Sequence, residues 1–82
     1  MALRVFINGE FFDKEDAKIS VYDHGLLYGD GVFEGIRSYG GKIFRLDHHL
    51  ERLWSSAKAI CLDIPLDHAT LARSCYETLE VN

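Results

Sequence analysis

The sequence predicts an α+β fold, in which two helices pack on a mainly antiparallel sheet. Two turn signals and one periodic pattern carry this prediction. Asn8-Gly9 and Gly40-Gly41 each stand between short apolar runs, and such two-residue turns are typical of β-hairpins. After residue 45 the apolar residues recur at intervals of three and four, which is the spacing of a helix packed on a sheet.

Strands are expected in the first half of the chain. The first hairpin turns at Asn8-Gly9, and a short third strand follows a charged turn at residues 13–16. A longer strand is expected from Val32 to Tyr39, and it pairs with the next strand across Gly40-Gly41. The expected strands are residues 4–8, 11–12, 17–22, 32–39 and 42–45.

Two helices are expected in the second half. Pro65 ends the loop between them, and Asp67 is a good N-cap for the second, with Leu66 and Leu71 placed as a hydrophobic staple. Trp54 lies one residue past the apolar stripe of the first helix, and we expect it to be partly buried in the same core. The two stripes are Leu46, Leu50, Leu53, Ala57 and Ile60, and Leu71, Cys75 and Leu79.

Composition narrows the class of protein. The 82 residues are 48% hydrophobic and 27% charged, which is ordinary for a single small globular domain or part of one. A net charge of −4 without a basic run argues against a nucleic-acid partner. Because no signal peptide or membrane span is recognisable, the expected location is the cytoplasm.

The cysteines and histidines do not predict a metal or redox site. Cys61 and Cys75 have neither redox nor zinc spacing, so both are predicted to be small buried thiols. His48 and His49 stand among acidic residues at a helix start, but they lack the spacing of a metal site. His24 lies in a glycine-rich loop, where we expect it to cap or brace the turn.

The stretch from Tyr22 to Arg37 has the composition of a binding site. Four glycines, two tyrosines and an arginine surround one short apolar strand. Strand alternation places an aromatic ring, a gap and a guanidinium on one face, which suits a pocket wall for an apolar group that carries a carboxylate. A solvated face with an exposed arginine is the alternative. The two faces are Phe33, Gly35, Arg37 and Tyr39, and Val32, Glu34, Ile36 and Ser38.

Two motifs in this order resemble a known family. The runs from Tyr22 to Arg37 and from Phe44 to Leu53 are similar to the N-terminal part of fold-type IV enzymes, which depend on pyridoxal 5′-phosphate (PLP). Phe33-Glu34-Gly35-Ile36-Arg37 most resembles the branched-chain amino acid aminotransferases. D-amino acid aminotransferases and aminodeoxychorismate lyases share the turn from Tyr28 to Gly31 and usually diverge after it.

The resemblance implies a role for particular residues. Arg52 matches the arginine that binds the cofactor phosphate, and Phe33, Gly35 and Arg37 match positions that line the substrate pocket. Tyr28 matches a tyrosine that reaches into the site of a neighbouring subunit, so the resemblance implies a homo-oligomer, most simply a dimer. The implied substrates are an amino acid and a 2-oxo acid, and no metal is implied.

The resemblance also implies that the chain is incomplete as a catalyst. Family members are several times longer, and their cofactor-binding lysine lies in a second domain that residues 1–82 do not match. Residues 1–82 are therefore expected to be one partial domain, the N-terminal segment of the small domain, without a catalytic residue and with weak or no PLP binding alone. A non-catalytic binding domain that kept the scaffold is the alternative. None of the four lysines stands in a matching motif: Lys14, Lys18, Lys42 and Lys58.

Overall fold

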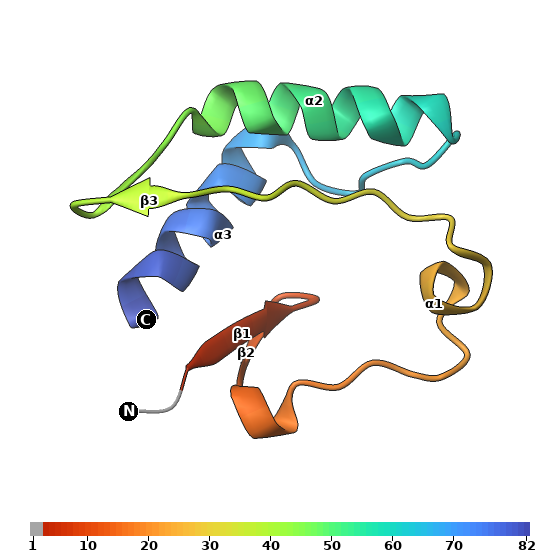
Figure 1. Ribbon diagram of the computed structural model, residues 1–82, viewed down its shortest axis with the longest axis horizontal. Coiled ribbons are helices and arrows are strands. Elements are labelled where there is room, and N and C mark those ends of the chain that lie inside the picture. The colour runs from red at the N-terminus through yellow and green to blue at the C-terminus, as the bar shows by residue number, and fades with distance from the viewer. Residues whose placement is uncertain (1–2) are drawn as a thin grey trace.

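The structure is a computed structural model that describes residues 3–82, and it confirms the α+β class (Figure 1). A hairpin, two short helices, a second hairpin and two long helices follow one another along the chain. The expected single sheet is instead two separate two-stranded antiparallel sheets. The elements are β1 (Arg4–Ile7), β2 (Glu10–Asp13), the 3₁₀ helix η1 (Lys14–Asp16), α1 (His24–Tyr28), β3 (Ser38–Tyr39), β4 (Lys42–Ile43), α2 (Leu46–Ala59) and α3 (His68–Val81).

Both hairpins form at the predicted turns. Asn8 and Gly9 have φ angles of 49° and 88°, which are the left-handed values that a tight hairpin turn between β1 and β2 requires. Across that hairpin the rings of Phe6 and Phe11 meet edge to face at 5.1 Å between centroids. Gly40-Gly41 likewise has φ angles of 56° and 81° between β3 and β4.

Two strand predictions are wrong in part or in full. Residues 17–22 form no strand, and Ile19 and Val21 are exposed. The chain turns at Ser20, whose hydroxyl oxygen accepts a hydrogen bond from the N–H of Tyr22 and whose carbonyl oxygen accepts one from the N–H of Asp23. The strand expected from Val32 to Tyr39 is regular only in β3. Residues 32–37 belong to neither ladder, although the Arg37 carbonyl oxygen accepts a hydrogen bond of 2.8 Å from the N–H of Phe44, next to β4.

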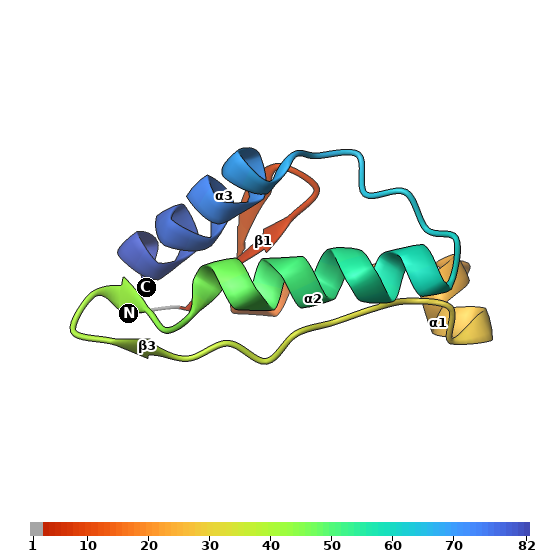
Figure 2. The same cartoon turned by 90° about the horizontal axis from the view of Figure 1, so that it is seen from above.

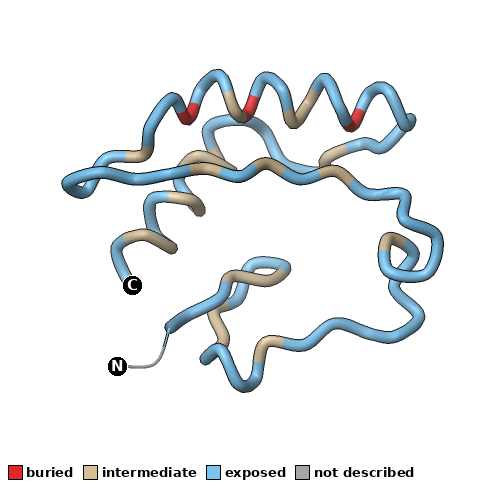
Figure 3. The backbone as a smooth tube through the Cα atoms, in the orientation of Figure 1, coloured by how far each residue is buried: buried red, intermediate tan, exposed pale blue. Residues whose placement is uncertain are grey.

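Both predicted helices form, and they contain the predicted apolar stripes except for Ile60. The buried residues of the described chain, Leu46, Leu50 and Ala57, all belong to the predicted stripe of α2, on the side that faces the rest of the chain (Figure 3). Ile60 follows the end of α2 and is exposed. The predicted stripe of α3 is half-buried rather than buried.

The start of α3 is held as predicted. The Asp67 carboxylate accepts a hydrogen bond of 2.7 Å from the backbone N–H of Thr70, which confirms it as the N-cap. Trp54 is half-buried, and its ring lies 4.1 Å from the ring of His68. This contact joins α2 to the first turn of α3.

The two cysteines differ in burial. Both are free thiols, but Cys61 is exposed, which corrects the prediction that it is buried. It lies just past the end of α2 with a φ angle of 58°, because the chain reverses direction there. Cys75 on α3 is half-buried, and burial raises the pKa of its thiol. Within residues 3–82 no helix is long and apolar enough to cross a membrane.

A cavity of about 550 Å³ lies between β1, the end of the extended segment and α3. Arg37 is one of its lining residues, beside Phe6 and Leu79. At one end the side-chain amide of Asn82 bonds to the backbone of Arg4, donating to its carbonyl oxygen at 3.0 Å and accepting from its N–H at 2.8 Å. These bonds hold the end of α3 against β1.

Candidate functional site

The glycine-rich stretch contains a short helix that the sequence analysis missed. Asp23 caps α1 by accepting a hydrogen bond of 3.3 Å from the N–H of Leu26, and Gly29 ends it in the left-handed region with a φ angle of 71°. His24 pairs with Asp30, and its ring lies 4.6 Å from the ring of Tyr28. His24 therefore braces this turn, as predicted. The sequence did contain a signal for this helix, because Asp23 is a favourable N-cap and Gly29, six residues later, is a favourable helix end.

From α1 the chain returns as an extended segment that runs beside α2 (Figures 1 and 2). Burial alternates along it. Val32, Glu34 and Ile36 are half-buried, whereas the intervening residues are exposed, and Phe33 reaches 90% exposure. Burial therefore confirms the predicted division into two faces for residues 32–37, but Ser38, which was predicted on the same face as Val32, is exposed.

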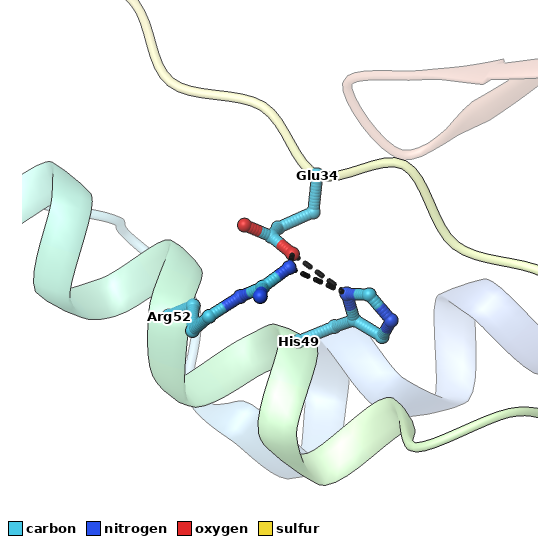
Figure 4. Close-up of polar contacts among 3 residues, drawn as sticks. All are labelled: Glu34, His49 and Arg52. Carbon is cyan, nitrogen blue, oxygen red and sulfur yellow. Dashed lines mark hydrogen bonds and ion pairs between the residues drawn. The ribbon is translucent and has the colours of Figure 1, made fainter.

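Glu34 joins the extended segment to α2 (Figure 4). One of its carboxylate oxygens, Oε1, lies 2.6 Å from Nδ1 of His49 and 2.7 Å from Nη2 of Arg52. The Glu34 and His49 side chains are only 13% and 17% exposed, whereas that of Arg52 is 68% exposed. We call these three residues the Glu34 cluster. It comes from one residue of the segment and one face of α2.

The chemistry of the cluster fixes its hydrogen bonds. An ionised carboxylate only accepts hydrogen bonds, so Nδ1 of His49 carries a hydrogen and donates a hydrogen bond to Glu34. The guanidinium of Arg52 donates a second hydrogen bond to the same oxygen. Nη2 of Arg52 and Nδ1 of His49, 3.5 Å apart, are then two donors that converge on one oxygen. The hydrogen bonds from Arg52 and then from His49 lower the pKa of Glu34 below its usual value.

The lowered pKa predicts that acid weakens the cluster. Ionised Glu34 stabilises the fold above its ordinary pKa of 4.5, and this stabilisation is lost as the pH falls through the lower pKa of the folded state. We expect Glu34→Gln to lower the melting temperature at neutral pH and to have a smaller effect in acid, once the pH has fallen below the lowered pKa of Glu34. Thermal unfolding over a series of pH values from neutral to acid measures the difference. Glu51→Gln, an exposed neighbour on α2, is the control, and a pH-independent difference for Glu34→Gln would contradict the prediction.

The structure places the predicted site residues in three groups. Arg52 joins Glu34, on the half-buried face of the segment, which we call the inner face. Phe33, Gly35 and Arg37 lie on the exposed face, which we call the outer face, and Arg37 also lines the cavity beside β1 and α3. Tyr28 belongs to α1 and is 71% exposed. The described chain therefore does not gather all five residues around one cavity.

Glu34 and His49 were not predicted as site residues. The signal for Glu34 was available, because a carboxylate between the inward-facing Val32 and Ile36 requires a polar partner. His49 and Arg52 are three residues apart on α2 and therefore share a helix face. Their joint contact with Glu34 could not be read from either pattern alone.

The runs from Tyr22 to Arg37 and from Phe44 to Leu53 resemble fold-type IV enzymes, and the α+β fold and the exposed Arg52 on α2 are consistent with that resemblance. A comparison with known families agrees. The family model for amino-transferase class IV matches residues 31–82, so the chain belongs to this family.

Individual relatives span two activities. The chain is 55% identical over 80 residues to a protein provisionally named branched-chain-amino-acid aminotransferase in Methanocaldococcus jannaschii, covering 98% of this chain and 28% of that protein. It is 46% identical over 79 residues to a D-alanine aminotransferase of Staphylococcus haemolyticus, covering 96% of this chain and 28% of the relative. For a D-alanine aminotransferase of Staphylococcus epidermidis the identity is 52% over 61 residues, covering 74% and 22%. The chain thus spans less than a third of each of these relatives.

Proposed function

We propose that this chain supplies one part of a PLP-dependent aminotransferase that moves amino groups between branched-chain amino acids and 2-oxoglutarate. The observation that carries the proposal is the exposed guanidinium of Arg52, held by Glu34 in a chain of the class IV family. When bound, PLP supplies an electron sink for the α-carbon of the amino acid. Residues 1–82 then contribute binding and orientation.

Arg52 fits a phosphate in its donor chemistry. A guanidinium has five N–H donors in a planar fork, and Glu34 engages only Nη2 among the described contacts of Arg52 with oxygen. The remaining donors belong to a side chain that is 68% exposed, so an anion can reach them. A bidentate contact with a phosphate is the interaction that such a fork forms best.

The outer face of the extended segment fits the substrate. Phe33 offers an apolar wall, and Arg37 offers a partner for the substrate carboxylate. A Cβ on Gly35 would meet nothing within 4 Å, so this position leaves room beside both. Tyr28, exposed on α1, is proposed to reach the site of a second subunit in a homo-oligomer.

A D-amino acid aminotransferase is the second candidate function, favoured by the D-alanine aminotransferase relatives.

A graft tests the proposal. Residues 1–82 would replace the matching segment of the Methanocaldococcus jannaschii relative, and we call this protein the graft. We expect it to bind PLP and to transfer the amino group of L-leucine to 2-oxoglutarate faster than that of D-alanine. The isolated chain is expected to show no turnover with either amino acid.

The outcomes separate the candidates. Preference of the graft for D-alanine would favour the second candidate over the first. A folded graft that binds PLP but transfers no amino group, while the unaltered relative does, would contradict both. Circular dichroism establishes that the graft is folded before either result is interpreted.

A further inference from the structure

We propose that Glu34 and His49 are positioning residues for Arg52, which hold its guanidinium in the orientation that receives the PLP phosphate. This inference rests on the proposed function. The geometry that supports it is the convergence of two donors on a single oxygen, with 2.6 Å to His49 and 2.7 Å to Arg52. Neither Glu34 nor His49 is proposed to touch the cofactor.

The burial of the cluster assigns these roles. Glu34 and His49 are 13% and 17% exposed, so their side chains are fixed by the segment and by α2, whereas Arg52 projects outward at 68%. A long arginine side chain in water samples many rotamers and loses that freedom when it binds an anion. A guanidinium that Glu34 already holds loses less, because part of the ordering has occurred in the folded protein.

Charge opposes this advantage. The Glu34 carboxylate repels a phosphate beside Arg52. Glu34 therefore favours phosphate binding only if ordering the guanidinium of Arg52 improves the binding free energy by more than this repulsion worsens it. The two effects can be separated by substitution. Glutamine keeps an oxygen that accepts the Arg52 hydrogen bond and removes the charge, whereas methionine removes both and still fills a largely buried position.

The experiment measures PLP and pyridoxal affinity of the apo graft by fluorescence titration. We expect Glu34→Met to weaken PLP binding about tenfold, the order expected for losing one favourable hydrogen-bonded orientation, and to leave pyridoxal binding unchanged. Glu34→Gln is expected to keep most of the PLP affinity. His49→Ala is expected to weaken PLP binding less than Glu34→Met, because Arg52 keeps its direct contact with Glu34.

Glu51→Gln is the matched control, since it removes an exposed carboxylate one residue from Arg52. Unchanged or tighter PLP binding in Glu34→Met would overturn the inference, as would an equal loss for pyridoxal. A loss in Glu34→Gln as large as that in Glu34→Met would also overturn it. If Arg52→Ala itself leaves PLP affinity unchanged, the proposed cofactor role fails; if only the Glu34 variants are silent, that role stands and the positioning inference fails.

Discussion

Arg52→Ala in the graft is expected to weaken PLP affinity about ten- to a hundredfold. A hydrogen bond to a charged group contributes roughly 1.5 to 3 kcal/mol, and each 1.4 kcal/mol corresponds to tenfold in affinity. The Arg52 side chain is largely exposed, so its removal leaves no cavity, and Glu34 keeps its hydrogen bond to His49; we therefore expect the graft to fold, with a lower melting temperature because the ion pair with Glu34 is lost. Titration of the apo graft with PLP, followed by cofactor absorbance, measures the loss.

Two further variants sharpen this test. Arg52→Lys keeps the charge but loses the planar fork, so we expect an affinity between those of wild type and Arg52→Ala. Arg73→Ala removes an exposed arginine from α3 and should leave PLP affinity unchanged. Equal losses in Arg52→Ala and Arg73→Ala would show that net charge, rather than a contact at residue 52, governs PLP binding.

The parts of the fold that depend on near neighbours were predictable. Asn8-Gly9 and Gly40-Gly41 each adopt the left-handed angles that glycine tolerates, so each turn forms its hairpin from local residues alone. Asp67 caps α3 for the same reason, because its side chain reaches an N–H three residues on. Strict alternation also predicted the two faces of residues 32–37, since an extended backbone alternates even without a partner strand.

The parts that depend on distant partners were not predictable. Residues 17–22 have the composition of a strand, but a strand is stabilised by pairing, and neither described sheet includes them. At residues 17–22, therefore, a strand-like composition was not enough to form a strand without a neighbouring strand to pair with.

The candidate site shows the same division. The family resemblance implied Arg52, and alternation indicated the outer face of the segment, but the cluster joins residues that lie 15 and 18 positions apart. Such a contact depends on where the segment crosses α2, which no local pattern specifies. The sequence therefore identified the residue proposed to bind the phosphate but not the residues that hold it.

Phe33→Ala in the graft is expected to reduce discrimination between L-leucine and L-alanine roughly tenfold or more, because a pocket wall for an apolar side chain is lost. Phe33 is 90% exposed in this chain, so its truncation should leave the melting temperature nearly unchanged. The ratio of kcat/KM for the two amino acids measures the effect. PLP affinity should stay the same, because Phe33 lies on the opposite face from Glu34, which contacts Arg52.

Val32→Ala is the matched control, one residue away on the half-buried face. It removes methyl groups that pack against the protein, so we expect a loss of roughly 1 kcal/mol in stability with unchanged discrimination. The pair therefore makes opposite predictions from adjacent positions: one variant alters specificity without stability, and the other alters stability without specificity. If both changed the kcat/KM ratio alike, the alternating burial of the segment would have no bearing on the substrate, and the proposed pocket wall would have to be abandoned.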